Sequence, residues 1–107
     1  MAVPETSIHT VKRKLDSGEK VVLVDVREAE ELENGALPGI VHIPMGDIMD
    51  RIGELDPSAE TVIVCRTGNR SRKVAEYLAG QGFSNVANLT EGMNGWAEAI
   101  GDGYRVY

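Results

Sequence analysis

Residues 62–71 read Val62-Ile63-Val64-Cys65-Arg66-Thr67-Gly68-Asn69-Arg70-Ser71. An apolar, β-branched run, typical of a buried strand, ends on the only cysteine of the chain, and a short polar loop that contains two arginines follows. After the loop, apolar residues recur at helical spacing, which predicts a helix from about residue 69 to residue 80 or 81. The stretch therefore places one thiol between the end of a strand and the beginning of a helix.

Length and composition limit the class of protein. The chain has 107 residues, which suits one domain spanning residues 1–107. Its formal net charge of −6 disfavours nucleic acid and membrane surfaces as partners. A single cysteine cannot form an intrachain disulfide, and neither a basic, apolar leader nor a membrane-length apolar run is read. We therefore expect a cytoplasmic protein.

Apolar runs alternate with amphipathic stretches along the whole chain. This alternation predicts an α/β fold with a mostly parallel sheet. Strands are expected at 21–24, at 41–44 near a sheet edge, at 61–64 and at 85–89. Helices are expected at 8–15 after an N-cap at Ser7, at 28–34, at 48–55 after an N-cap at Asp47, at 69–80 and at 92–100, with an irregular tail from 101 to 107.

The loop after Cys65 has the residues that a reactive thiol needs. In a parallel sheet, ligands bind beyond the carboxyl ends of the strands, where the following helix points its N-terminus at the site. Gly68 lets the loop curl so that successive N–H groups converge on an anion, which lowers the pKa of a thiol. The predicted anion-binding residues are Arg66, Thr67, Gly68, Asn69 and Arg70. The chemistry is nucleophilic attack by Cys65 on an activated sulfur to give a persulfide, which needs no metal and no cofactor.

Other residues have structural interpretations beside functional ones. Cys65 by itself is also compatible with a small apolar core residue. Asp25 either orients the active loop or caps the turn after its strand, and Arg27 is expected to pair with a carboxylate among residues 28–33. His9 and His42 match no metal-ligand spacing and are interpreted as structural, and Trp96 as a core residue.

Four segments together resemble the single-domain, rhodanese-like sulfurtransferases. They are Val21–Glu28 with its Asp-x-Arg, Gly35–Pro44, the loop Cys65–Ser71, and Glu91–Trp96. The resemblance implies a central sheet of about five strands flanked by helices on both faces, with the persulfide on Cys65 and the loop from Arg66 to Arg70 binding the donor. Asp25 and Arg27 are then supporting residues. The chain departs from the family pattern at Ala36, where histidine is usual, and at Glu91, where a second glycine is common.

The resemblance implies transfer of sulfane sulfur from thiosulfate or a persulfide to cyanide, a thiol or a sulfur-carrier protein. One alternative is a cysteine-dependent phosphatase or arsenate reductase. Those enzymes resemble Cys-x5-Arg, whereas here the spacing from Cys65 to Arg70 is Cys-x4-Arg and Ser71 stands at the phosphatase arginine position. The other alternative is a binding module that keeps the fold without turnover, which the intact Cys65 disfavours.

Overall fold

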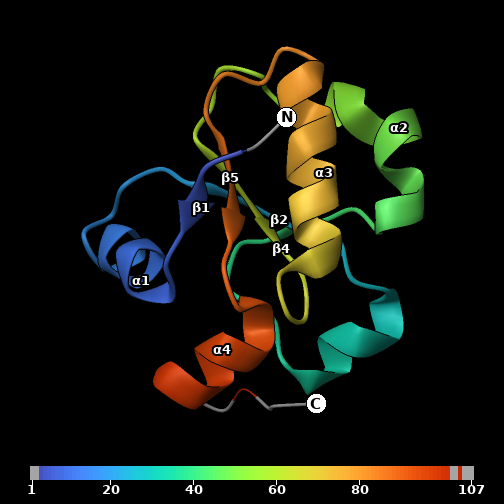
Figure 1. Ribbon diagram of the computed structural model, residues 1–107. Helices are drawn as coiled ribbons and strands as arrows, with labels where there is room; N and C mark the ends of the chain where they lie inside the picture. Colours follow the sequence, from blue (N-terminus) through green and yellow to red (C-terminus); the bar gives the residue numbers. More distant parts are fainter. Residues whose placement is uncertain (1–2, 102–103, 105–107) are drawn as a thin grey trace.

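The computed structural model describes residues 3–101 and residue 104, and it consists of one sheet with helices on both faces (Figure 1). All neighbouring strands run parallel, in the order β1-β5-β4-β2-β3. The strands are β1 (Glu5–Thr6), β2 (Val22–Asp25), β3 (Val41–His42), β4 (Thr61–Val64) and β5 (Val86–Leu89). The predicted α/β fold with a sheet of about five strands is confirmed.

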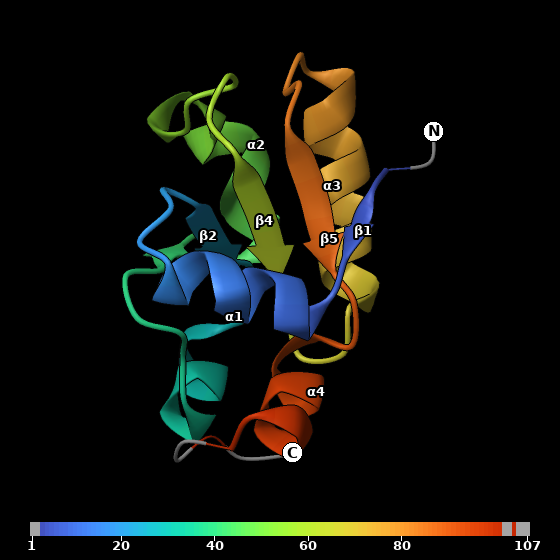
Figure 2. The same ribbon diagram turned by 90° about the vertical axis from the view of Figure 1, so that its left-hand side faces the viewer.

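The helices divide the core into two layers, one on each face of the sheet. Helices α1 (Ile8–Asp16) and α4 (Gly92–Ala99) cover one face, while α2 (Ile48–Arg51) and α3 (Asn69–Gly80) cover the other (Figure 2). Alternate residues of β4 therefore enter different clusters: Val62 and Val64 pack with α1 and α4, and Ile63 packs with α3. Burial on both faces explains why this strand is apolar at every position from 62 to 64.

Two predicted helices differ in kind from what the structure shows. Residues 29–34 form a 3₁₀-helix, η1 (Ala29–Asn34), which Glu28 begins through a capping box with Glu31. The segment after Pro44 is α2 flanked by two 3₁₀ turns, η2 (Met45–Asp47) and η3 (Ile52–Glu54). Asp47 is already in helical conformation at the end of η2, and within the described residues its side chain forms no capping hydrogen bond. Asp47 therefore stands at the predicted N-cap position of α2, but its side chain does not cap the helix.

Other local predictions are confirmed. The Ser7 side chain accepts a hydrogen bond from the Thr10 N–H at 3.1 Å and so caps α1. β3 lies at a sheet edge, just before Pro44. Of the predicted irregular tail, only Gly101 and Tyr104 lie within the described residues. No helix in the described part of the chain is both long and apolar enough to cross a bilayer.

Neighbouring strands bring two sequence motifs to one edge of the sheet. β2 and β4 pair so that Asp25 lies beside Val64, and the Val26 N–H donates to the Val64 carbonyl at 2.9 Å. The chain after β2 and the cysteine loop after β4 therefore leave the sheet side by side. Figure 1 shows that loop at the carboxyl ends of the strands, close to the N-terminus of α4.

A buried ion pair joins Asp25 to Arg27. Both side chains are 0% exposed, and Arg27 Nη2 lies 2.8 Å from Asp25 Oδ2. Asp25 also accepts the Arg27 main-chain N–H at 3.1 Å and so caps the turn after its strand. We expected Arg27 to pair with a carboxylate among residues 28–33. It reaches this segment by donating to the main-chain carbonyl of Glu31 at 3.2 Å, and it also donates to the carbonyl of Gly35 at 2.9 Å. One guanidinium thus contacts both the middle of η1 and the residue that follows its last turn.

Removing one partner of this pair is expected to destabilise the protein strongly. Arg27→Met leaves the Asp25 carboxylate buried without its cation, and we expect a loss of about 3–5 kcal/mol in the free energy of unfolding, measured with urea. The control is Arg51→Met, which breaks the exposed pair of Arg51 with Glu54 and should leave stability unchanged within error. Equal urea midpoints for the two variants would contradict the structural role of Arg27.

Candidate active site

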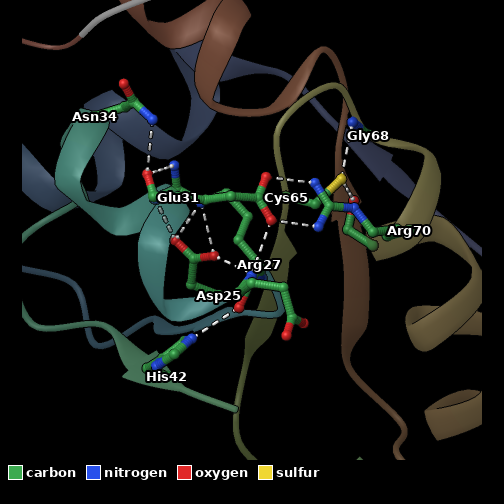
Figure 3. A network of polar contacts seen from close by, with 10 residues as sticks. Asp25, Arg27, Glu31, Asn34, His42, Cys65, Gly68 and Arg70 are labelled. Carbon is green, nitrogen blue, oxygen red and sulfur yellow. Dashed lines mark hydrogen bonds and ion pairs between the residues drawn. The ribbon is translucent and has the colours of Figure 1, made fainter. Parts of the chain in front are cut away.

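The loop after β4 curls around the sulfur of Cys65. Gly68 has φ 97°, a left-handed conformation that glycine adopts without strain, and it turns its N–H back to donate to Cys65 Sγ at 3.1 Å. The Ser71 hydroxyl lies 3.2 Å from the same sulfur. Cys65 is only 1% exposed, so a reactant must be brought into the loop itself. Figure 3 shows the hydrogen bond from the Gly68 N–H to the Cys65 sulfur as a dashed line.

The N-terminus of α4 holds the other side of the loop. The N–H groups of Met93 and Asn94 donate to the carbonyls of Cys65 and Arg66 at 2.8 and 2.9 Å. This approach requires glycine at position 92, because a Cβ there would lie 2.5 Å from the Cys65 carbonyl oxygen. Glu91, at a position where glycine is common in the resembling family, is the one described non-glycine residue with positive φ, at 70°. The backbone therefore keeps the glycine-like turn despite this substitution.

The loop favours the thiolate of Cys65. Burial of the thiol acts to raise its pKa, because a buried charge loses hydration. Hydrogen bonds oppose that effect, and they come from the Ser71 hydroxyl and from the main-chain N–H groups of Ser71, Gly68 and Thr67. The balance holds the pKa of Cys65 below its ordinary value of 9.0. A lowered pKa increases the fraction of thiolate, which is the nucleophilic form of a thiol.

A buried polar chain stands behind the sulfur. The Ser71 hydroxyl donates to the Asn88 side-chain carbonyl, while the Asn88 amide donates to the Gly68 carbonyl at 3.0 Å and to Glu5 at 2.9 Å. Ser71 and Asn88 are both 0% exposed. Because a hydroxyl has one proton, Ser71 can donate to Asn88 while it accepts from the thiol, or it can turn that proton toward the thiolate. Ser71 thus adapts to either protonation state of Cys65.

Arg70 forms a bidentate ion pair with Glu31 of η1 (Figure 3). Its Nη1 lies 2.6 Å from Oε1 and its Nη2 lies 2.8 Å from Oε2. The hydrogen bond from Arg70 lowers the pKa of Glu31 from 4.5 to about 2, against the opposing effect of burial. Glu31 is therefore a carboxylate at neutral pH, and one of the two predicted anion-binding arginines already holds an anion from its own chain.

The other predicted site residues are arranged unevenly around the loop. Arg66, Thr67 and Asn69 have exposed side chains at the loop surface, whereas Gly68 is buried against the sulfur. Asp25 and Arg27 lie beneath η1 and contact the site through Glu31. His42 contacts the Arg27 carbonyl through Nε2 at 2.8 Å, a structural role. Trp96 is buried, as expected, and the described residues contain no cluster suited to a metal.

Sequence reasoning missed Ser71, Asn88 and Glu31. In the sequence, Ser71 stands at the phosphatase arginine position, and its place in the first turn of a helix is a usable signal because that turn is close to any group bound at the helix N-terminus. An asparagine within the apolar strand 86–89 was a usable signal, because a polar side chain buried in a strand needs a partner. Glu31 had no distinguishing signal, since three other glutamates lie among residues 28–33.

The structure thus defines an α/β domain with a parallel sheet and a cysteine loop between its central strand and the next helix. The model of the family described as "Rhodanese-like domain" matches residues 7–99, and the chain belongs to this family. A crystal structure of a rhodanese-like domain protein from Staphylococcus aureus superposes with a TM-score of 0.84 at 33% identity, covering 97% of this chain and 98% of that one.

Curated relatives carry sulfur-related names. YtwF of Bacillus subtilis, provisionally named a sulfurtransferase, is 44% identical over 90% of this chain and 92% of its own length. The thiosulfate sulfurtransferase GlpE of Pseudomonas savastanoi is 40% identical over 76% of each chain. YrkF of B. subtilis, provisionally named a sulfur carrier protein, is 42% identical over 89% of this chain, which spans only 51% of YrkF.

We expect Ser71→Ala to raise the pKa of Cys65. The change removes a hydrogen bond that favours the thiolate and leaves burial, which disfavours it, in place. The measurement is a pH titration of the far-ultraviolet absorbance of the thiolate. Ser84→Ala, at an exposed position, is the control and should titrate as the unmodified protein does. If the titration midpoint of Ser71→Ala is equal to or below that of the unmodified protein, Ser71 does not lower the pKa of Cys65.

Gly92→Ala is expected to push the loop away from α4. Its Cβ would lie 2.5 Å from the Cys65 carbonyl and 2.6 Å from the Arg66 carbonyl, in a backbone with φ +59°. Gly82→Ala is the matched control, since φ is +94° there and nothing described lies within 4 Å of a Cβ. The free energy of unfolding of the control should fall by about 1–2 kcal/mol, because alanine is strained in a left-handed backbone conformation. Gly92→Ala should lose roughly 1–3 kcal/mol more through the clash, and equal losses in urea unfolding would contradict the tight contact.

Proposed function

We propose that this protein is a sulfurtransferase that moves sulfane sulfur from thiosulfate or a persulfide donor to a thiophilic acceptor through a persulfide on Cys65. The observation that carries the proposal is the convergence of the Gly68 N–H and the Ser71 hydroxyl on a buried sulfur, at 3.1 and 3.2 Å. The names of relatives in the same family, sulfurtransferase and thiosulfate sulfurtransferase, support it.

In the loading step the Cys65 thiolate attacks the outer, sulfane sulfur of the donor. With thiosulfate, the new S–S bond forms as the donor's S–S bond breaks, and sulfite leaves with the electron pair. The protein is left with a persulfide anion on Cys65, and the total charge is unchanged. The loop N–H groups and the Ser71 hydroxyl that favour the thiolate are suited to stabilise this second sulfur anion as well.

In the discharge step a nucleophilic acceptor attacks the outer sulfur of the persulfide and the Cys65 thiolate leaves. Cyanide would give thiocyanate, a thiol would give a new persulfide, and a sulfur-carrier protein would take the sulfur onto its own acceptor group. The name of YrkF, which contains a sequence similar to this chain, makes a carrier protein a reasonable partner to test. The pair of steps restores the starting thiolate and consumes no cofactor.

Two features weigh against the phosphatase alternative. Phosphate ester cleavage needs an acid to protonate the leaving group. The carboxyl group beside Arg70 of the loop is that of Glu31, and its pKa of about 2 keeps it ionised at neutral pH. The loop arginine is also paired with that carboxylate at 2.6 and 2.8 Å. A binding module without turnover has no need for a cysteine whose pKa is lowered against the effect of its own burial.

The decisive experiment is intact-protein mass spectrometry after brief exposure to thiosulfate. We expect the protein to gain the mass of one sulfur atom, and to lose it on addition of cyanide with release of thiocyanate. Cys65→Ser should keep the fold, because serine is nearly isosteric, and should gain nothing. A gain of equal size in Cys65→Ser, or none in the reduced unmodified protein with either thiosulfate or an organic persulfide, would overturn the proposal.

A further inference from the structure

The ion pair with Glu31 engages the guanidinium of Arg70, the group that would bind the oxyanion of an anionic sulfur donor. Both guanidinium nitrogens that face Glu31 are engaged, at 2.6 and 2.8 Å, in the two-pronged geometry that guanidinium groups also use for oxyanions. The pair is partly shielded, with the Arg70 side chain 35% exposed and that of Glu31 21% exposed. A sulfonate or sulfate group can take this place on Arg70 only by displacing the carboxylate.

Glu31 is held in position by its own segment. Its carboxylate also accepts the Glu28 main-chain N–H at 2.9 Å, which completes the capping box of η1. Its main-chain carbonyl accepts from Arg27, which is itself fixed by Asp25. The carboxylate is therefore preorganised toward Arg70, and its displacement would give up hydrogen bonds on both sides.

The charge around this pair does not favour a small dianion. Residues 28–33 carry Glu28, Glu30, Glu31 and Glu33 and no basic residue. In α3, which follows the cysteine loop, Arg72 Nε lies 3.3 Å from Glu5 Oε2, so this carboxylate partly neutralises the charge of Arg72. A thiosulfate dianion approaching Arg70 would thus meet a carboxylate already in place and further carboxylates behind it.

We propose that Glu31 is a specificity-determining residue, which rests on the proposed function: its carboxylate competes with oxyanion donors for Arg70 and so disfavours thiosulfate relative to organic persulfides, which carry no oxyanion group. An organic persulfide R–S–SH delivers its outer sulfur to the Cys65 thiolate, the S–S bond breaks, and the thiol R–SH leaves with the proton. That exchange places no oxyanion on Arg70. The ion pair can then stay intact during loading.

Binding separates this competition from turnover. The Cys65→Ser variant cannot accept sulfur. Calorimetry compares the thiosulfate affinity of this variant with that of the double variant that also carries Glu31→Gln. Freeing Arg70 should tighten binding roughly threefold to tenfold, as expected for release of a partly exposed, bidentate ion pair. Glu33→Gln, an exposed neighbour with the same change of charge, is the matched control and should change affinity less than twofold. Equal effects of the two substitutions, or weaker binding with Glu31→Gln, would overturn the proposal.

Two further measurements test whether the effect passes through Arg70 and reaches the chemistry. In an Arg70→Ala background, Glu31→Gln should no longer tighten thiosulfate binding, and a persisting gain would contradict competition for Arg70. With Cys65 present, Glu31→Gln should speed loading from thiosulfate and leave loading from 2-hydroxyethyl persulfide unchanged, and equal acceleration of both would contradict the selectivity. If neither donor loads the unmodified protein, the proposed function fails, whereas the binding comparison still decides the role of Glu31.

Discussion

The guanidinium of Arg27 is fully buried, and the arrangement of the site depends on how that charge is satisfied. A cation removed from water is tolerated only when it is paired and hydrogen-bonded. Asp25 supplies the opposite charge from the end of β2, and the carbonyls of Glu31 and Gly35 accept two further hydrogen bonds. A second strand joins through His42, whose Nε2 meets the Arg27 carbonyl at 2.8 Å. The need to satisfy one buried cation thus fixes η1 relative to the end of β2, and the main-chain carbonyl of the same residue adds a contact to β3.

This constraint extends to the cysteine loop. With η1 fixed, the Glu31 carboxylate meets Arg70 on one side of the loop, while the Met93 and Asn94 N–H groups hold its carbonyls on the other. A loop held from both sides keeps its own N–H groups pointed at the sulfur without reorganisation when charge develops there. The charged residues conspicuous in the sequence therefore act largely by positioning the loop, and the contacts with the reacting atom come from loop N–H groups and the Ser71 hydroxyl.

The sequence predicted those parts of the structure that follow from local patterns. The apolar run at 61–64 and the helical spacing after it located Cys65 at the end of a central strand, because burial on both faces demands continuous apolar residues. The pairing of Arg70 with Glu31 was not predictable, because 39 residues separate them in the sequence and neither local composition nor periodicity distinguishes Glu31 from its neighbours. Sequence periodicity did not predict the 3₁₀ form of η1 either, because Arg27, which lies outside the segment, donates to main-chain carbonyls within it and just after it.

The same comparison changes how the charge of the site is understood. Arg66, Arg70, Arg72 and Lys73 lie close together in the sequence of an acidic protein, a pattern that favours binding of a small anion. In the structure, carboxylates face two of these cations: Glu31 on Arg70 and Glu5 on Arg72. The groups that touch the sulfur are instead N–H and O–H dipoles. Such dipoles act over short distances and are screened little by salt when buried, so they can favour a sulfur anion inside the loop without drawing every anion in solution toward it.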